Sequence, residues 1–336
     1  MTGQKEDIED HHRTYILTFD LGPKIRLLRT EGLKTPDQND PFFLELKDEI
    51  ERRIQGFFPD ATIKSVTTED LADEIMSQAV HQKTLLREAE IVSTCLELAI
   101  LRRGHSIEIN RIVDQAGQII GLGPRPSYPC LDEQIHSINA VSNSRPLVLV
   151  EDGSFTGSTL IHILDKLEGQ RMSVAAIVIG FAFPKALEAV QARFEGEVVV
   201  VEPMEEFIDW MPDHDFFPFT PNCGRVLGMS WNGTNLPFYT HNGASYAVPY
   251  LIPFCPMTRW TSIPEDYIYD FSMFCLQQTL KLFELIGRLS GEPVTIGQLM
   301  DVRPKISIPV PIGGSGLPRL NARVVDFLSD VCHELA

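Results

Sequence analysis

The segment Leu147–Leu160, LVLVEDGSFTGSTL, constrains the fold more than any other part of the chain. Its first four residues are all apolar, which is typical of a buried strand in a parallel sheet. Glu151 and Asp152 follow at the end of this strand, where open α/β sheets hold their ligands. After a short loop, apolar residues recur at helical spacing from Leu160 to Leu167. The segment therefore predicts a strand, a ligand-binding loop and a helix, in that order.

The loop itself has the chemistry of an anion site. Glycines leave backbone N–H groups accessible, and Ser and Thr hydroxyls add donors at the start of the helix. A phosphate monoester fits such a loop, and the two carboxylates before it suit hydrogen bonds from vicinal hydroxyls. The alternative is an ordinary strand-to-helix turn with polar caps. The loop residues are Gly153, Ser154, Phe155, Thr156, Gly157, Ser158 and Thr159.

This segment resembles the PRPP-binding motif of the type I phosphoribosyltransferases, in which apolar residues precede two acids and a loop with Thr-Gly and a final Thr or Ser. The resemblance implies that Glu151 and Asp152 are the catalytic acids, which bind the ribose hydroxyls, and that the loop holds the 5′-phosphate. It implies Mg²⁺ as the cofactor, bound through PRPP and possible at the same two carboxylates. The implied enzyme is a glycosyltransferase that moves ribose 5-phosphate from PRPP to a nitrogenous base, or from a nucleoside monophosphate to pyrophosphate.

Two basic segments before this motif are candidates for the pyrophosphate site. Residues 112–129 have a strand, turn, strand pattern that ends with Arg125 and the pair Ser127 and Tyr128. In the hypoxanthine branch of the family a Ser-Tyr pair lies on a flexible loop over the active site, so the resemblance implies a flap here. An ordinary surface loop is the alternative. Arg103 belongs either to the pyrophosphate loop or to a solvated helix end.

The fold class follows from alternating patterns on both sides of the motif. Apolar runs at 147–150, 174–180 and 198–201 are separated by helical patterns, which predicts a βαβαβ unit. Right-handed crossovers then build a parallel sheet with helices on both faces. We expect an α/β fold of the type I phosphoribosyltransferase kind, with a loop-rich aromatic hood and a C-terminal helical segment.

The chain is long enough for a large domain with additions. We expect residues 1–75 to form an N-terminal hairpin and helical extension. The phosphoribosyltransferase-like core and its hood then occupy residues 76–256. Residues 257–336 form a C-terminal helical extension, which could support a homodimer.

Local patterns give the expected elements of the flanking segments. Residues 15–21 and 24–29 predict the two strands of the hairpin, in which Asp20 has no partner in sequence. Helical spacing extends over 69–101 and again over 268–289. These segments are expected to be architectural.

The hood, residues 204–256, offers aromatic and titratable side chains. Its aromatics either stack on a planar base or fill a small secondary core. The run Asp213-His214-Asp215 suggests metal ligands or an acid and base pair, but adjacent residues rarely converge on one ion, so we interpret it as a polar turn. The aromatic residues in question are Trp210, Phe216, Phe217, Phe219 and Trp231.

Composition limits the partners. A formal net charge of −17 argues against nucleic acid as the main partner, so a polyanion such as PRPP would need Mg²⁺ and well-placed Arg or Lys residues. No apolar run has the length of a membrane helix, and the charged start lacks a secretory pattern, so we expect a cytoplasmic protein without a membrane partner. The six scattered cysteines predict buried thiols, not disulfides or zinc ligands.

Two other functions are compatible with these residues. A non-catalytic regulator could keep the pocket as a sensor of PRPP or a nucleotide and lack a working pyrophosphate loop. A nucleotide or sugar-phosphate hydrolase could use Glu151 or Asp152 as a base on a similar sheet.

Overall fold

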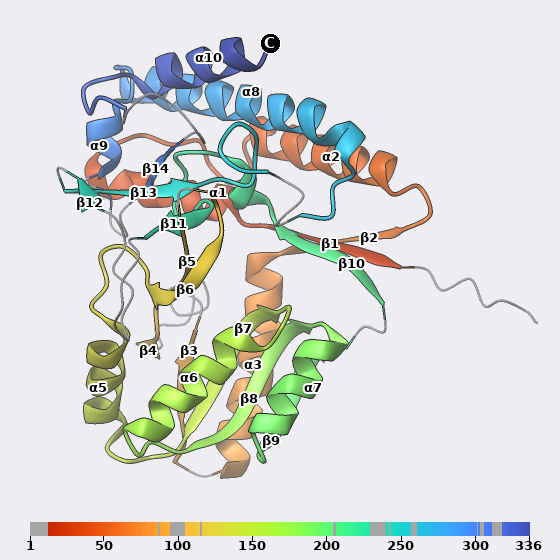
Figure 1. Ribbon diagram of the computed structural model, residues 1–336, viewed down its shortest axis with the longest axis vertical. Coiled ribbons are helices and arrows are strands. Elements are labelled where there is room, and N and C mark those ends of the chain that lie inside the picture. The colour runs from red at the N-terminus through yellow and green to blue at the C-terminus, as the bar shows by residue number, and fades with distance from the viewer. Residues whose placement is uncertain are drawn as a thin grey trace, which may run out of the picture.

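The computed structural model describes most of the chain, and its elements form two lobes, one above the other in Figure 1. The lower lobe contains a five-stranded sheet and the upper lobe a mixed sheet under several helices. A three-stranded sheet lies between them. The described residues are 13–86, 88–94, 105–114, 116–203, 206–228, 240–241, 243–256, 261–300, 302, 306–310 and 318–336.

The five-stranded sheet of the lower lobe is parallel throughout and has the order β4-β3-β7-β8-β9. One face buries Leu147 and Leu149 against helices α5, α6 and α7, and the other buries Val148 and Val150 against α3. Successive residues of a strand point to opposite faces, so an apolar run such as 147–150 is what a doubly covered strand requires. The strands are β3 (Glu90–Ser93), β4 (His105–Ser106), β7 (Leu147–Ser154), β8 (Val174–Ala182) and β9 (Glu197–Glu202). The helices are α3 (Thr68–Leu86), α5 (Leu131–Ser142), α6 (Ser158–Gly169) and α7 (Pro184–Arg193).

The three-stranded sheet, of order β10-β1-β2, is also parallel. Its central strand is β1 (Thr14–Phe19), between β2 (Thr62–Thr67) and β10 (Phe207–Pro212). Ile16 packs into the core around α3, whereas Tyr15 and Leu17 pack into the core of the upper lobe. This sheet therefore joins the two lobes, one on each of its faces.

The upper lobe contains a mixed sheet of order β12-β13-β11-β5-β6, with β14 beside β13. Helices α2, α8 and α10 contribute to the largest hydrophobic core, and they form the top of Figure 1. The strands are β5 (Ile109–Val113), β6 (Ile119–Pro124), β11 (Arg225–Leu227), β12 (Thr240–His241), β13 (Ala244–Val248) and β14 (Ile308–Pro309). The helices are α1 (Leu21–Ile25), η1 (Arg26–Glu31), α2 (Pro41–Phe57), η2 (Asp213–Phe216), α8 (Glu265–Ser290), α9 (Ile296–Met300) and α10 (Val324–Leu335).

The α/β class, the helices on both faces of a parallel sheet and the C-terminal helices agree with the sequence analysis. The expected N-terminal hairpin is wrong. Residues 24–29 are helical because β1 already pairs with β2 on one side and β10 on the other, which leaves no edge for a hairpin partner. The helix expected over 69–101 ends at Leu86, and β3 follows because Ile91 and Val92 pair with β7.

The expected boundaries of the phosphoribosyltransferase-like core, after residue 75 and after residue 256, stay predictions. One hydrophobic core combines residues of all three expected segments, from Tyr15 through Phe216 to Leu328. The described cysteines, all except Cys95, are free thiols. None of the helices in the described ranges is long and apolar enough to cross a membrane.

Candidate functional site

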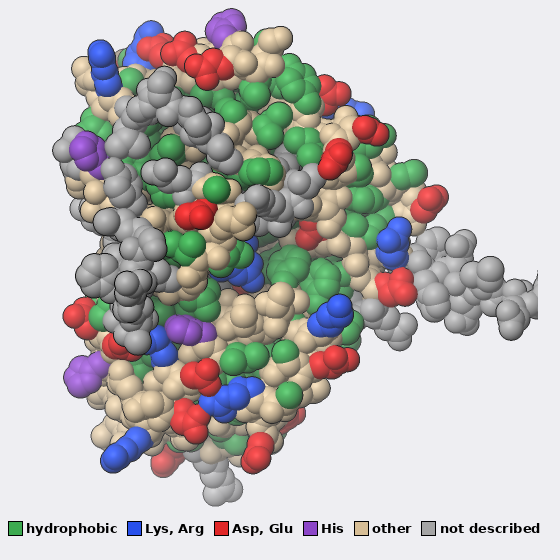
Figure 2. Space-filling model, viewed as in Figure 1, with side chains coloured by type: hydrophobic (Ala, Val, Ile, Leu, Met, Phe, Trp, Pro, Cys, Tyr) green, Lys and Arg blue, Asp and Glu red, His purple; other side chains and the backbone are tan. Residues whose placement is uncertain are grey.

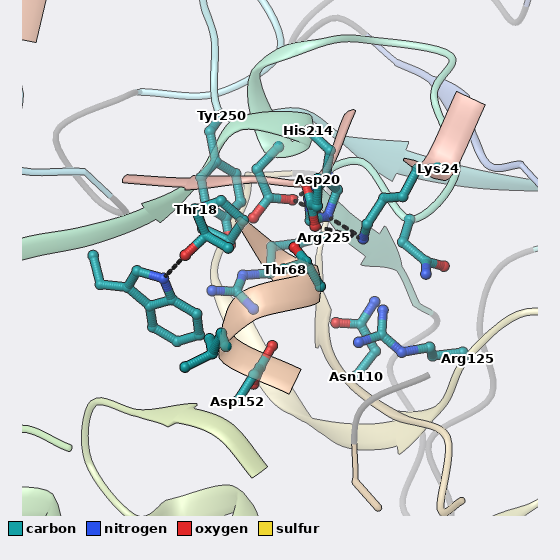
Figure 3. A pocket seen from close by; sticks show the side chains of 16 residues that line it. Thr18, Asp20, Lys24, Thr68, Asn110, Arg125, Asp152, His214, Arg225 and Tyr250 are labelled. Atoms are coloured by element: carbon teal, nitrogen blue, oxygen red, sulfur yellow. Dashed lines mark hydrogen bonds and ion pairs between the residues drawn. The ribbon is translucent and has the colours of Figure 1, made fainter. Parts of the chain in front are cut away.

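A cleft of about 720 Å³ lies between the lobes and is visible as a hollow in Figure 2. Residues from β5, β7, β10 and β11 line it, so both lobes contribute. A smaller cavity of about 110 Å³, here called the inner cavity and shown in Figure 3, adjoins the cleft and shares lining residues with it, among them Asp152, Trp210 and Arg225. The two spaces together form the candidate site.

Glu151 and Asp152 lie on the cleft at the end of β7. Glu151 is 9% exposed, and its Oε2 has no hydrogen-bond partner among the described residues. Burial and the charge of Asp152 raise the pKa of Glu151 well above its ordinary value, although Arg111 and Arg125 act in the opposite direction. The neighbouring Asp152 accepts a hydrogen bond from the N–H of Gly153 (2.8 Å).

The loop after the acids also lies on the cleft and leads into α6. The hydroxyls of Thr156 and Ser158 are exposed and hydrogen-bonded to each other (2.9 Å). Gly157 has a φ of 75°, a left-handed conformation that favours glycine, and it directly precedes α6. Ser154 is buried and does not line the cleft. The loop residues that line it are Gly153, Phe155, Thr156, Ser158 and Thr159.

Three arginines of the upper lobe line the same cleft. Arg111 belongs to β5 and Arg225 to β11, and the two strands pair in parallel with Ile112 opposite Val226, which places the arginines at matching positions. Burial and the neighbouring charge of Arg225 lower the pKa of Arg111. Arg125 follows β6, and its Nε lies 3.5 Å from the buried carboxylate of Glu108. Three guanidinium groups of the upper lobe thus share the cleft with the acid pair and the hydroxyl-rich loop that follow β7.

Arg125 is one of the site residues predicted from the sequence, whereas Arg111 and Arg225, which are far apart in the chain, were not predicted. Ser127 and Tyr128 follow Arg125 in a turn and are not among the described residues that line the cleft. Their proposed role as a flap stays a prediction. Arg103 lies outside the described residues.

The inner cavity contains a buried cluster of charged groups, shown in Figure 3. Nδ1 of His214 lies 2.8 Å from Oδ1 of Asp20, and Nζ of Lys24 lies 3.0 Å from Nε2 of His214 and 3.3 Å from Oδ2 of Asp20. Asp213 accepts hydrogen bonds from the backbone N–H groups of Asp20 and Leu21, both at 2.9 Å. Asp20 therefore has partners, and residues 213–215 form a largely buried helical turn, not a simple polar turn at the surface.

Electrostatics within this cluster decide which groups are charged. Burial works to raise the pKa of Asp20, but His214 and Lys24 outweigh it and hold that pKa below its ordinary value. Burial and the charge of Asp20 raise the pKa of Asp213 well above its ordinary value. Oxygen and nitrogen atoms of Asp20, Asp213 and His214 lie within 4.8 Å of one another, as in a metal site. The ammonium of Lys24 already supplies a cation there, so we assign no metal to this cluster.

Aromatic rings form the wall between the loop and the hood. Trp210 donates from Nε1 to Oγ1 of Thr18 (2.6 Å), and its ring lies 5.7 Å from that of Phe155 with an angle of 14° between the planes. Both rings line the cleft. Phe216, Phe217 and Phe219 are buried in the largest hydrophobic core, so they fill a core as the alternative predicted, but this core is not a small secondary one. Trp231 lies outside the described residues.

Asp209 lines the cleft, and its titration should be measurable through the neighbouring Trp210. Burial raises its pKa to about 6, although the N–H groups of Ser262 and Trp210 donate to its carboxylate. The pKa of Asp209 is higher in the folded than in the unfolded protein, so its titration contributes to folding stability below about pH 4. This contribution is lost as the pH rises through about 6, which lowers the free energy of unfolding by at most about 3 kcal/mol. Tryptophan fluorescence should therefore change with a midpoint near pH 6. Asp209→Asn should abolish this transition, and an unchanged transition would contradict the assignment.

The fold and the site define an α/β protein with a cleft at the carboxyl end of a parallel strand, where the acid pair after β7, a hydroxyl-rich loop and three arginines are among the lining residues. No family model and no curated protein matches the sequence. Among solved structures, an adenine phosphoribosyltransferase is similar at 12% identity and a TM-score of 0.27, over 40% of this chain and 79% of that one. The protein TT1426 from Thermus thermophilus is similar at 18% identity and a TM-score of 0.23, over 42% and 83% of the respective chains. At such TM-scores neither structure assigns a function.

Proposed function

We propose that this chain binds PRPP with Mg²⁺, or a nucleoside monophosphate, and transfers ribose 5-phosphate to or from a nitrogenous base with pyrophosphate. One observation carries the proposal: the acid pair, the hydroxyl-rich loop and three arginines line a single cleft. Acids suit the ribose hydroxyls, the helix-initiating loop suits the 5′-phosphate, and arginines suit a pyrophosphate group.

The residues would act mainly by position and charge. As the bond between the anomeric carbon and pyrophosphate lengthens, positive charge develops on the sugar and negative charge on the leaving group. Arg111, Arg125 and Arg225 would stabilise the departing pyrophosphate from the upper lobe. Asp152 would orient the ribose from below, and the loop would hold its phosphate, so that the acceptor nitrogen meets the anomeric carbon in a fixed geometry.

The donor set fits Mg²⁺ bound through the substrate. Mg²⁺ prefers oxygen ligands and is commonly held by one or two carboxylates together with substrate phosphates and water. Glu151 offers a buried carboxyl oxygen without a partner among the described residues, and Asp152 lies beside it. When bound, the metal would supply positive charge against the phosphates. Protons compete with the metal for a carboxyl whose pKa is raised, so Mg²⁺ binding should strengthen as the pH rises through the pKa of Glu151.

The test is calorimetric titration of PRPP with Mg²⁺ into the wild type and Asp152→Asn. The variant keeps the shape of the side chain but loses the charge that would hold the ribose, so affinity should fall roughly 10- to 100-fold. Asp326→Asn is the matched control, since Asp326 lies on α10 in an exposed ion pair with Arg323. It should bind like the wild type. Equal affinity of Asp152→Asn and the wild type would overturn the proposed site.

A second candidate is a regulator that binds PRPP or a nucleotide without turnover. The observation that favours it is the raised pKa of Glu151, which comes from burial and the charge of Asp152 and makes the carboxyl a poorer metal ligand. Pyrophosphate release across a panel of bases separates the two: base-dependent release supports the transferase, and binding without release supports the regulator. A cytoplasmic location, a homodimer and the absence of a nucleic-acid partner stay predictions from the sequence.

A further inference from the structure

Trp210 connects the three-stranded sheet, here called the joining sheet, to the loop that follows the acid pair. Its Nε1 donates a hydrogen bond to Oγ1 of Thr18 on the neighbouring strand β1 (2.6 Å, Figure 3). Both side chains are largely buried, with 4% of Thr18 and 7% of Trp210 exposed. A buried indole N–H usually has an acceptor, because leaving it unpaired is costly. The hydroxyl of Thr18 therefore holds the indole in a fixed position.

The same indole lies directly on the end of β7. A Cβ added to Gly153 would lie 2.2 Å from Cζ3 of Trp210, so the ring occupies the space that a side chain at position 153 would need. The N–H of Gly153 donates to Oδ1 of Asp152 (2.8 Å). The indole thus packs on the residue whose backbone orients the second acid.

Phe155 gives the indole a second contact with the loop. The rings of Phe155 and Trp210 lie 5.7 Å apart with an angle of 14° between their planes. Phe155 also stacks on Phe183, which directly precedes α7, at 4.7 Å and 27°. The N–H of Phe183 donates to the C=O of Ser154 (3.0 Å). The loop therefore contacts the joining sheet through Trp210 and the lower lobe through Phe183.

The lower lobe supports the shape of the loop by itself. Ser154 pairs with Ala182 of β8, and the hydroxyls of Thr156 and Ser158 are bonded to each other where α6 begins. None of these contacts involves the joining sheet. Loss of the bond between Thr18 and the indole should therefore leave the loop intact and change only where it lies relative to the joining sheet.

The place of the loop matters for a ligand that reaches both lobes. Arg111 and Arg225 line the cleft from strands of the upper lobe. The upper lobe packs on the other face of the joining sheet, around Tyr15 and Leu17 of β1. The distance from the loop to the arginines thus depends on how each lobe sits on this sheet. A ligand held at both ends binds best when its two sites already lie at the distance that it spans.

We propose that Thr18 and Trp210 are positioning residues, which hold the phosphate loop at the distance from the upper-lobe arginines that PRPP requires. The inference rests on the proposed function, in which the loop holds the 5′-phosphate and the arginines hold the pyrophosphate. It distinguishes two ligands. Ribose 5-phosphate needs only the loop and the acids, whereas PRPP must also reach the arginines, so PRPP alone depends on the distance between the lobes.

Thr18→Val tests the inference, because valine keeps the size of the side chain but offers the indole no acceptor. In calorimetry with Mg²⁺ we expect its affinity for PRPP to fall roughly tenfold and its affinity for ribose 5-phosphate to stay within about twofold of the wild type. Thr18→Ser keeps the hydroxyl and should bind PRPP within about twofold of the wild type. A merely structural role of Thr18 would not change the ratio of the two affinities.

Thr279→Val is the matched control. Thr279 is buried in α8, its hydroxyl donates to the C=O of Cys275 (2.8 Å), and it is not among the residues that line the cleft or the inner cavity. This variant should bind both ligands like the wild type even if its melting temperature falls. Trp210→Phe keeps an aromatic ring but lacks Nε1, so it should show the same selective loss of PRPP affinity. It decides the matter if Thr18→Val does not fold.

The outcomes separate the inference from the proposed function. If the wild type binds PRPP and the tested variant binds it equally well, the inference is overturned and the proposed function stands. The same holds if the variant loses both ligands equally, if Thr18→Ser binds PRPP as weakly as Thr18→Val, or if the wild type binds PRPP but not ribose 5-phosphate. If the wild type does not bind PRPP, the proposed function is wrong, and the inference fails with it.

Discussion

Replacing Asp20 by alanine should lower the free energy of unfolding by about 3–5 kcal/mol. The change removes the anion that faces Lys24 (3.3 Å) and His214 (2.8 Å) and leaves a buried ammonium without its carboxylate. An isolated buried charge costs far more than a paired one contributes, so the loss exceeds that of a surface ion pair. Urea unfolding at neutral pH, followed by circular dichroism, measures the difference.

The control is Asp37→Ala, which breaks an ion pair with Arg29 in which the aspartate side chain is 85% exposed. Its cost should stay below about 1 kcal/mol. The pH dependence of the stability difference between wild type and Asp20→Ala gives a second check. The folded pKa of Asp20 lies below its unfolded value, so its contribution is present above about pH 4 and is lost as the pH falls through the folded pKa. A difference between wild type and Asp20→Ala that stays constant down to strongly acidic pH would contradict this account.

The lower lobe could be predicted from the sequence because its signals are local. The apolar run 147–150, the acids after it and the helical spacing from Leu160 lie within one short segment, and the fold keeps them in that order. A doubly covered parallel strand needs apolar residues on both faces, so its pattern is visible without knowledge of its neighbours. The same reasoning located the strands near 174 and 198.

The rest of the site depends on pairings between distant segments. Arg111 and Arg225 meet only because β5 and β11 are neighbours, and Asp20 meets His214 across 194 positions of the chain. No local pattern encodes such pairs. One pattern in the sequence could have helped. Asp152 was predicted because an acid follows an apolar strand, and Asp20 and Asp213 each follow a strand in the same way. Applied to the whole chain, this pattern would have indicated that Asp20 and Asp213 also lie at the carboxyl ends of strands.

Gly153→Ala should destabilise the protein by at least about 3 kcal/mol and weaken PRPP binding by roughly a hundredfold. A Cβ at this position would lie 2.2 Å from Cζ3 of Trp210 and 2.7 Å from two further ring atoms. The indole cannot shift easily, because its Nε1 is bonded to Thr18 and its face packs against Phe155. Either the end of β7 moves, which displaces Asp152, or the ring moves into the cleft. Thermal unfolding and PRPP calorimetry on one preparation measure both effects.

A double-mutant cycle with Trp210→Leu tests whether the clash is the cause. If the indole is what the new methyl group meets, the cost of Gly153→Ala should fall by more than half in the Trp210→Leu background, because the smaller side chain leaves room. Gly56→Ala is the matched control. It lies in α2 with nothing within 4 Å of the added Cβ, and it should keep or raise stability by up to about 1 kcal/mol. Equal costs of Gly153→Ala in both backgrounds would show that Gly153 is required for its own backbone conformation, and that Trp210 does not determine the geometry at the end of β7.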